Sequence, residues 1–455
     1  LAPDDIRCWS GLGSLLRAVR RPAEAALAAG RAAALRPGLA EAHANHGDAL
    51  REAGALAEAE AALRRAVALG PGRAELLAGL GAVLKAADRP EAAAAVFAAA
   101  VALAPDHPRI QGNLAQARHA ANRLDAAAAA HRRALLLAPG DPDLRFAAAQ
   151  TALARGEIAA GFDLHEGGFA AGLRPVRHAG LPAWDGSPLA GRTILVWREQ
   201  GVGDELHFAS CYADLIAAAG HVVIEAEPRL VPLMRRSFPA ATVVPEDGAP
   251  PEVLARVELQ VAAGSLPRFL RRRPEDFPRR AGHLVPDPAA VAARRAELAA
   301  LGPGPKVGIA WRSARGRHAV AAEVSRIADW EPLLRRPGLR FVGLQYDDSA
   351  EERAFALERF GAPIHVVPGL DLRGDLDGGA ALTAALDLVV SVPISAADMA
   401  TAVGTPLWLV ARLPHPRLLG QAEYPWGRNV RPFGRRPDEP WSAVLARVAA
   451  ALPGG

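Results

Sequence analysis

The chain has 455 residues, of which 51% are apolar, so it can form two to four domains with separate hydrophobic cores. No segment approaches the roughly 18 consecutive uncharged apolar residues of a transmembrane helix, and we therefore predict no membrane span. The net charge of +4 is too small to indicate nucleic-acid binding. The chain has two cysteines, Cys8 and Cys211, which are far apart in the sequence; they argue against a disulfide framework and favour a reducing, cytoplasmic location. Because the chain begins with Leu1, the sequence leaves a removed targeting segment open.

The first third of the chain repeats at an interval of 34 residues. Small and turn-forming residues recur at fixed points, as two packed helices per unit require, and proline ends the second helix of each unit. The recurring residues are Pro3, Pro37, Pro71, Pro105 and Pro139; Gly13, Gly47 and Gly81; Ala25, Ala59, Ala93 and Ala127; Ala32, Ala66, Ala100 and Ala134; Leu35, Leu69, Leu103 and Leu137; and Gly54, Asp88, Asn122 and Gly156. With Trp9, Leu12 and Gly13 at its opening positions, this pattern resembles the tetratricopeptide repeat. We expect about four full units and a fifth that extends into Gly161–Glu166.

This resemblance implies an α-solenoid whose first helices line a groove that binds peptides. Asn45 and Asn113 occupy the same repeat position, two units apart. In nucleocytoplasmic O-GlcNAc transferases, an asparagine ladder at this position holds the backbone of the protein substrate. Asn45 and Asn113 are therefore candidates for a peptide-binding groove, and the alternative is that they are ordinary polar residues on a solvated helix face.

The Pro- and Gly-rich passage Leu173–Arg192 is typical of a connector. The apolar run Ile194–Trp197 after it predicts a buried parallel strand. Gly201 and Gly203 let the backbone turn sharply, and Asp204 stands at the expected N-cap of a helix. Free N–H groups at such a helix start favour an anion at the carboxyl end of the strand.

Apolar runs and helical patterns then alternate in two successive blocks. Such blocks imply two doubly wound parallel sheets that face one another, with a ligand between them at the strand ends. The predicted strands are Val222–Glu227, Thr242–Val244, Leu259–Ala262, Lys306–Arg312, Arg340–Gln345, Ile364–Val367, Leu388–Val392 and Pro406–Val410. The predicted helices are Leu230–Ser237, Val291–Leu301, Trp330–Arg335, Ala350–Arg359, Ala380–Leu386, Ser395–Val403 and Trp441–Leu452.

Several motifs resemble bacterial repeat proteins that carry a heptosyltransferase-like GT-B glycosyltransferase module, some of which glycosylate flagellin. The motifs are Phe162–Glu166, Trp184-Asp-Gly-Ser-Pro-Leu189, Trp197-Arg-Glu-Gln-Gly-Val-Gly-Asp204, Val307-Gly-Ile-Ala-Trp311, Phe341-Val-Gly-Leu-Gln-Tyr346 and Ala385-Leu-Asp-Leu-Val-Val-Ser-Val392. The resemblance implies a solenoid followed by an α/β GT-B fold of two Rossmann-like halves. The expected domains are the solenoid at 1–172, the first half at 173–283 with a linker at 173–192, a connector at 284–305, the donor-side half at 306–440 and a terminal helix at 441–455.

The resemblance also supplies candidate site residues. Asp204 matches the carboxylate of a Gly-x-Gly-Asp loop that is proposed as the base in heptosyltransferases, and helix capping is its alternative role. The candidate donor-binding residues are Gly201, Gly203, Arg312, Arg326, Gln345, Ser391, Ser395 and Asp398. Arginine suits a diphosphate because its planar fork donates two parallel charge-assisted hydrogen bonds.

The donor loop departs from the pattern of these relatives, which carry Ser-Val-Asp-Thr followed by a His. Here Pro393 stands in place of the Asp and Asp398 in place of the His. A carboxylate beside a diphosphate repels it unless a metal ion or an arginine intervenes. Either the donor differs, or this half has lost catalysis and kept binding.

The remaining signals are weaker. Asp375-Leu-Asp377 fits a metal motif of the other main glycosyltransferase fold, but its position in a Gly-rich turn before a helix favours capping. Arg271–Arg273 and Arg279–Arg280 form a basic run that is either a solvated loop or a phosphate-contacting patch. Gly201-Val-Gly203 could open a dinucleotide-binding fingerprint, but Leu206 stands where the third glycine of that fingerprint is required. The histidines do not have the spacing of metal ligands.

We therefore hypothesise a cytoplasmic, metal-independent glycosyltransferase without a cofactor. Its co-substrate would be a nucleotide sugar and its partner a protein acceptor recruited by the repeats, with no nucleic acid involved. The alternative is a non-catalytic repeat scaffold whose degenerate GT-B module binds a nucleotide, a sugar or a protein.

Overall fold

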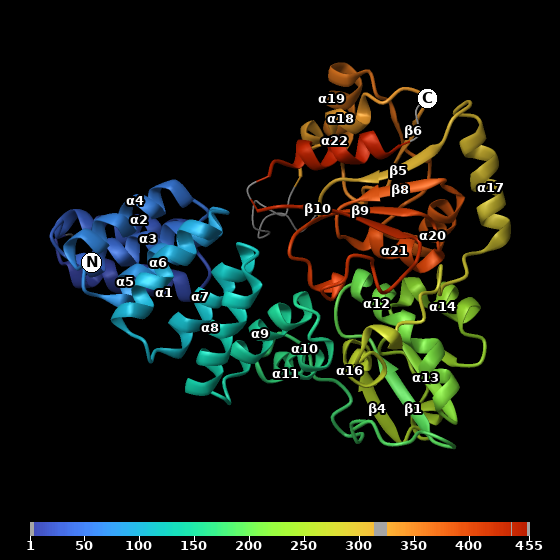
Figure 1. The fold of residues 1–455 in the computed structure, drawn as a ribbon, viewed down its shortest axis with the longest axis horizontal. Helices are drawn as coiled ribbons and strands as arrows, with labels where there is room; N and C mark the ends of the chain where they lie inside the picture. Colours follow the sequence, from blue (N-terminus) through green and yellow to red (C-terminus); the bar gives the residue numbers. More distant parts are fainter. Residues whose placement is uncertain (1–3, 314–324, 438, 453–455) are drawn as a thin grey trace. The chain divides into compact units, whose positions relative to one another are not determined.

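The computed structural model describes residues 4–313, 325–437 and 439–452. Pro3, and the parts of the expected domains at 314–324, 438 and 453–455, lie outside these ranges. The fold divides into two compact units, one ending at Thr151 and the other beginning at Ala152 (Figure 1). None of the described helices has the length and apolar character that would let it cross a membrane.

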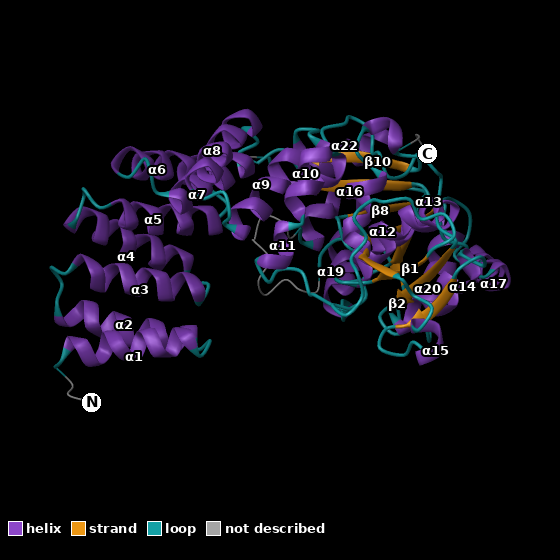
Figure 2. Cartoon of the chain, turned by 90° about the horizontal axis from the view of Figure 1, so that it is seen from below, coloured by secondary structure: helices purple, strands orange, loops and turns teal. Residues whose placement is uncertain are grey.

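The first unit consists of paired antiparallel helices, seen as successive layers in Figure 2. Its helices are α1 Ile6–Ala18, α2 Pro22–Leu35, α3 Ala40–Glu52, α4 Leu56–Leu69, α5 Ala74–Ala86, α6 Pro90–Leu103, α7 Pro108–Ala120, α8 Leu124–Leu137 and α9 Pro142–Ala154, the last of which extends past the unit boundary. The helices α2, α4, α6 and α8 each end two residues before a recurring proline, as the sequence predicts.

The repeated small residues lie where helices approach most closely. A Cβ atom on Gly47 would lie 2.6 Å from Cγ of Leu63, and one on Gly81 would lie 2.8 Å from the Phe97 ring. The turn residues that recur in phase, from Gly54 to Gly156, all have positive φ angles, between 55° at Asp88 and 83° at Gly54. A left-handed residue is a common way to end a helix, so the repeat interval reflects a turn as well as a packing contact.

The second unit opens with α10 Ile158–His165 and α11 Gly167–Ala170 and continues into two parallel sheets. The first sheet has the order β3-β2-β1-β4. Its strands are β1 Thr193–Trp197, β2 His221–Ala226, β3 Thr242–Pro245 and β4 Leu259–Ala262. The chain order reverses between β1 and β4, and in doubly wound sheets this switch point opens a crevice at the carboxyl ends of the strands.

The second sheet has the order β10-β9-β8-β5-β6-β7, which is the doubly wound order 3-2-1-4-5-6 viewed from its other edge. Its strands are β5 Lys306–Ala310, β6 Arg340–Gly343, β7 Ile364–His365, β8 Leu388–Ser391, β9 Leu407–Arg412 and β10 Val430–Arg435. The two separate sheets of parallel strands confirm the expected α/β region. The sequence reading missed β10, because Pro432 and Gly434 disfavour a strand, but β10 is an edge strand, where proline is tolerated.

Helices pack around both sheets. They are α12 Val202–Phe208, α13 Tyr212–Ala218, α14 Val231–Ser237, α15 Pro251–Leu254, α16 Leu266–Leu270, α17 Pro288–Ala299, α18 Glu331–Leu334, α19 Ala350–Phe360, α20 Leu376–Ala385, α21 Ser395–Val403 and α22 Trp441–Ala451. In Figure 1, α12 of the first sheet lies against α21 of the second, and the two helices are in contact. This contact brings the loops that precede both helices together.

The passage expected to be a connector, Leu173–Arg192, is instead packed against the first sheet. The side chain of Arg174 is fully buried and donates to Glu199 at 2.9 Å and to Ser265 at 2.9 Å. Ala183 forms a parallel bridge with Gln260 of β4. Proline and glycine marked the irregular backbone of this passage correctly, but they do not report on its burial.

The basic run contacts carboxylates within the second unit. Both Arg271 and Arg280 pair with Asp214, the latter at 2.7 Å, and Arg272 pairs with Asp163 at 3.0 Å. Arg273 pairs with Asp276 at 3.3 Å, and Arg279 pairs with Glu423. These arginines therefore connect elements of the unit, and each of them already has a carboxylate partner.

Candidate functional site

A cavity of about 570 Å³ lies between the two sheets of the second unit, at the carboxyl ends of their strands. The loops that follow β1, β2 and β5 to β9 contribute its lining. The sequence placed a ligand at these strand ends, and both switch points open here. This cavity is the candidate site.

Asp204 lines the cavity, but it does not cap α12 as the sequence suggested. The N-cap residue is Gly201, and Asp204 lies in the first turn of the helix. Its Oδ1 atom accepts a hydrogen bond of 2.9 Å from Nη2 of Arg417. Among the described residues, no hydrogen bond reaches Oδ2 of Asp204, so this oxygen can accept a proton from a ligand.

Gly203 allows α12 to approach α21. A Cβ atom at this position would lie 2.7 Å from Oδ2 of Asp398 and 3.4 Å from Cα of Ser395. Ser395 and Asp398 both line the cavity, from the first turn of α21. Thus Gly201, Gly203, Asp204, Ser395 and Asp398 come together, although they lie in two separate parts of the sequence.

Asp398 is buried, with only 7% of its side chain exposed, and pairs with Nη1 of Arg417. The pKa of Asp398 is raised from its ordinary value of 3.8 to about 6, because burial and, to a smaller extent, the Asp204 carboxylate outweigh the opposing charge of Arg417. Asp398 is therefore partly protonated in mildly acidic solution and ionised at neutral pH.

Arg417 is the residue that the sequence reading missed. It lies in the 3₁₀ turn η7 Pro416–Leu418, after β9, and bridges the two aspartates. Trp426 Nε1 donates to the Arg417 carbonyl at 3.1 Å, which holds this turn in place. Burial lowers the pKa of the Arg417 guanidinium, but the nearby acidic groups, Asp398 first, outweigh burial and raise it. No motif marks Arg417, although the convergence of strand ends predicts that the loop after β9 reaches the site.

Two further arginines line the cavity and were not among the predicted residues. Arg229 donates from Nε to Glu227 at 2.8 Å and from Nη1 to the Arg373 carbonyl at 2.5 Å. The guanidinium of Arg373 is exposed and makes no hydrogen bond or ion pair with another described residue. An anionic ligand can therefore reach Arg373 without displacing an internal partner, whereas Arg229 already pairs with Glu227.

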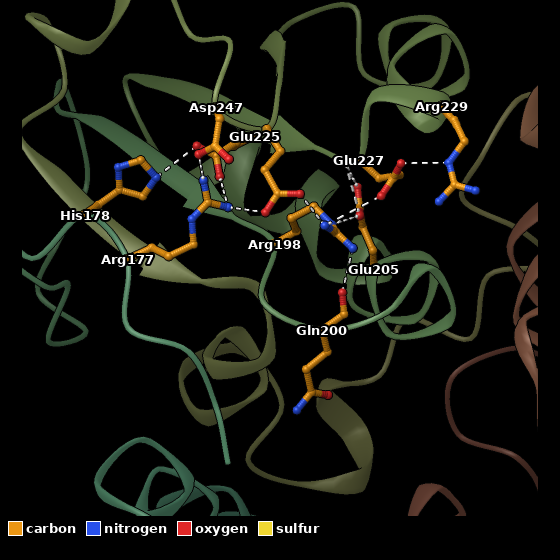
Figure 3. A network of polar contacts seen from close by, with 10 residues as sticks. Arg177, His178, Arg198, Gln200, Glu205, Glu225, Glu227, Arg229 and Asp247 are labelled. Carbon is orange, nitrogen blue, oxygen red and sulfur yellow. Dashed lines mark hydrogen bonds and ion pairs between the residues drawn. The ribbon is translucent and has the colours of Figure 1, made fainter. Parts of the chain in front are cut away.

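A network of charged residues lies behind Arg229 (Figure 3). Arg198 donates to Glu205 at 2.7 Å and to the Gln200 carbonyl at 2.6 Å. Glu205 also accepts from the backbone N–H of Glu227 at 3.0 Å, and Glu227 in turn holds Arg229. Burial raises the pKa of Glu205 to about 7, against the opposing charge of Arg198. The network ties the glycine loop after β1 to the loop that carries Arg229.

Two predicted donor residues have structural partners beside the cavity and do not themselves line it. Arg312 pairs with Asp347 and, at 2.6 Å, with Glu352. Gln345 accepts from the Trp311 N–H at 3.1 Å and donates to the Arg312 carbonyl at 2.8 Å, so it fixes the end of β5 against the end of β6. Their neighbours Ser313, Tyr346 and Asp347 line the cavity.

The remaining predicted residues lie elsewhere. Ser391 is fully buried at the end of β8 and donates to the Val392 carbonyl at 2.7 Å. Arg326 is exposed and precedes the 3₁₀ turn η6 Ile327–Trp330. Neither residue is among the described residues that line the cavity. Asn45 and Asn113 lie on α3 and α7 of the first unit, and Asp375 caps α20 as predicted, accepting from the Gly378 N–H at 2.8 Å.

Within the described residues, no group of three His, Cys, Asp or Glu side chains is arranged to hold a metal ion. The polar lining of the cavity consists mainly of three arginines, three aspartates and two serines. Such a lining can bind an anion through arginine and accept a proton through a carboxylate.

Comparison with known proteins assigns the first unit to a class. Residues 50–118 match the family model of the tetratricopeptide repeat, so the N-terminal helical pairs are tetratricopeptide repeats. The chain is similar to the protein FlbA of Caulobacter vibrioides, with 38% identity over 316 residues that make up 66% of this chain and 53% of FlbA. The chain thus spans about half the length of this curated relative.

Part of the chain is similar to solved structures, two of which are TPR proteins. YrrB, a TPR protein with an unusual peptide-binding site, matches with a TM-score of 0.30 and 19% identity over 37% of this chain and 87% of that chain. TTC0263, a thermophilic TPR protein of Thermus thermophilus, matches with a TM-score of 0.33 and 21% identity over 35% of this chain and 88% of that chain.

Proposed function

We propose that the chain is a glycosyltransferase with a GT-B module, which transfers a sugar from a nucleotide sugar to a protein recruited by the repeats. The observation that carries the proposal is the cavity in which Asp204 lies opposite the donor-side loop Pro393–Asp398, at the ends of two doubly wound sheets. A carboxylate on one side and arginines around the cavity are the groups that a sugar transfer requires.

In the proposed reaction, the acceptor hydroxyl oxygen bonds to the anomeric carbon of the sugar as the bond to the leaving phosphate oxygen breaks. Oδ2 of Asp204 takes the hydroxyl proton, because its other oxygen is held by Arg417. Arg229 and Arg373 neutralise the negative charge that develops on the leaving nucleotide. Arg417 stays paired with Asp204 and Asp398 and keeps the base oriented.

A second candidate function is binding without transfer. The observation that favours it is the pairing of Arg417 with two aspartates, which uses one of the three cavity arginines for internal neutralisation. A cavity of this kind would still bind a nucleotide or a sugar through Arg229 and Arg373. It would present this ligand to a protein that is bound by the repeats.

The test starts with a thermal-shift panel of UDP, GDP, ADP and CMP sugars against the full chain. A donor that raises Tm is then incubated with candidate acceptor proteins, and mass spectrometry detects the added sugar. Asp204→Asn should lower the transfer rate by about 10²–10⁴-fold while leaving the donor-induced Tm shift intact. Asp247→Asn, with a side chain that is 84% exposed, is the matched control and should transfer at the normal rate.

Full transfer by Asp204→Asn would remove the base role. A clear donor shift without any transfer would favour the binding function, and the absence of a shift with every donor would contradict both functions.

A further inference from the structure

The loop that carries Arg417 rests on the helical pair α9–α10. This loop, residues 413–429, joins β9 to β10, and we call it the Arg417 loop. Gly156 lies in the turn between α9 and α10 and, like the whole Arg417 loop, belongs to the second compact unit. A Cβ atom on Gly420 would lie 2.7 Å from the Gly156 nitrogen. The two backbones are therefore in direct contact, at a point where two glycines allow the close approach.

Gly156 differs from its counterparts in the repeats by what covers it. It is the fourth of the recurring turn residues, after Gly54, Asp88 and Asn122. Gly54 has nearly the same φ angle, 83° compared with 81°, but a Cβ atom there would meet no described atom within 4 Å. A Cβ atom on Gly156 would lie 3.2 Å from the Leu419 carbonyl oxygen. A position that holds larger side chains in two earlier repeats is thus covered by the Arg417 loop.

The contact falls on a strained part of the Arg417 loop, two residues after Arg417 itself. Leu419 and Gly420 both have left-handed backbones, with φ angles of 50° and 69°. A left-handed leucine is unfavourable and persists only where its surroundings fix it. The Leu419 side chain is buried, and its carbonyl oxygen faces Gly156. The turn between α9 and α10 is therefore one of the surfaces that hold this strained segment in place.

Trp426 provides a second link between the Arg417 loop and α10. Its ring centroid lies 6.3 Å from that of Phe162 on α10 and 4.1 Å from that of His207 on α12. The buried indole also donates from Nε1 to the Arg417 carbonyl at 3.1 Å. His207 follows Asp204 by about one turn of α12. One ring thus connects α10 with both members of the Asp204–Arg417 ion pair.

From these contacts we infer that the helical pair α9–α10 positions Arg417 and is therefore a structural part of the candidate site. Gly156 supports the segment after Arg417, and Trp426 fixes the same loop against Phe162. These three residues are not among the described residues that line the cavity, so they act through Arg417 as positioning residues. The inference rests on the proposed function in taking the Asp204 cavity as the working site, and it names the part of the chain that keeps Asp204 paired.

Hydrogen exchange measured by mass spectrometry on the full chain tests this support without any nucleotide sugar, so a failure of sugar transfer leaves the test unaffected. Asn122 stands at the same repeat position with a left-handed backbone, so asparagine fits the turn and Gly156→Asn perturbs only what lies over it. In this variant, amide exchange in residues 413–429 should be at least about fivefold faster than in the unchanged protein. Gly54→Asn is the matched control, and it should leave the exchange of these residues unchanged because the space around Gly54 is open among the described residues.

The pH dependence of stability then shows whether Arg417 itself has moved. Arg417 and Asp204 are the charged groups beside Asp398, and the Arg417 charge opposes the rise of the Asp398 pKa to about 6. The contribution of Asp398 is the difference in unfolding free energy between each protein and its Asp398→Asn counterpart. If Arg417 withdraws, the pH at which this contribution is lost should move upward by about one unit in Gly156→Asn. It should stay near 6 in Gly54→Asn.

A second pair of variants keeps the test informative if Gly156→Asn is unstable. Phe162→Leu removes the ring that contacts Trp426 and should give the same upward shift, whereas Phe97→Leu, at a buried position on α6, should give none. Far-ultraviolet circular dichroism monitors the fold of each variant. Equal exchange of residues 413–429 in the Gly156 and Gly54 variants would overturn the inference. A pH midpoint that stays near 6 in both Gly156→Asn and Phe162→Leu would also overturn it, because the loop would then have loosened without moving Arg417.

Discussion

Replacing Asp398 by Asn should change how the stability of the second unit depends on pH. Asp398 lies almost fully buried between Arg417 and Gly203, and its pKa in the folded chain is about 6, compared with an ordinary value of 3.8. The folded state therefore holds the Asp398 proton at pH values where the unfolded chain has already released it. The stabilisation from this proton is fully present below pH 3.8 and is lost as pH rises through about 6.

The size of the effect follows from the pKa difference. One pKa unit corresponds to about 1.4 kcal/mol, so the difference between 3.8 and about 6 is worth about 3 kcal/mol over the whole range. Between pH 4 and pH 7 we expect about 2 kcal/mol of this change, because the proton of the unfolded chain is already half lost at pH 4. Over that interval, the free energy of unfolding of Asp398→Asn should rise by about 2 kcal/mol relative to the unchanged protein.

Urea unfolding followed by tryptophan fluorescence measures this difference. The second unit contains every tryptophan except Trp9, so the signal reports mainly on that unit, and Trp426 lies directly on the Arg417 turn. Asp247→Asn, which changes an exposed carboxylate in the turn after β3, controls for the loss of one negative charge. If the curves of unfolding free energy against pH run parallel for the unchanged protein and Asp398→Asn, burial does not control the Asp398 proton and the reasoning fails.

Three further substitutions test the packing. Gly81→Ala would place Cβ 2.8 Å from the Phe97 ring and should lower helical stability by about 1–3 kcal/mol, measured by circular dichroism during urea unfolding. Gly203→Ala should cost about 1–3 kcal/mol in the tryptophan-monitored transition and should raise the KM for the donor, because α12 must move away from α21. Arg174→Met should lower the free energy of unfolding by about 3–5 kcal/mol in the same transition, because it leaves the Glu199 carboxylate buried without its cation. An unchanged urea midpoint would contradict the view that Arg174 neutralises Glu199.

The repeats were predictable because several independent positions obey one interval. A glycine that allows two helices to touch, as at Gly47 and Gly81, and a left-handed residue that ends a helix, as at Asp88 and Asn122, are local requirements that each unit must meet again. The alternation of apolar runs likewise predicted the two parallel sheets. It could not predict β10, because Pro432 is acceptable only at a sheet edge, and the sequence does not show which strand lies at the edge.

The site was only partly predictable, for a physical reason. Gly201, Gly203 and Asp204 belong to a single loop, so their proximity is local and the sequence displays it. Arg417 is 213 residues from Asp204 and meets it only because two sheets direct their strand ends to one cavity. Arg312 shows the opposite case: the resemblance made it a candidate donor-binding residue, but its guanidinium pairs with Asp347 and Glu352, and it is not among the described residues that line the cavity.

The contact with Arg417 also changes how the proposed donor loop, Pro393–Asp398, is interpreted. Under the proposed glycosyltransferase function, Asp398 stands where the proteins that this region resembles carry a histidine, and a lone carboxylate there would repel a diphosphate. With Arg417 in contact, the Asp398–Arg417 pair carries no net charge when Asp398 is ionised, as a neutral histidine would. When Asp398 is protonated, Arg417 still has Asp204 as its partner. The exchange of His for Asp is therefore compatible with an anionic ligand, provided that the attraction comes from Arg229 and Arg373, which stand on the loops after β2 and β7 and face the same cavity.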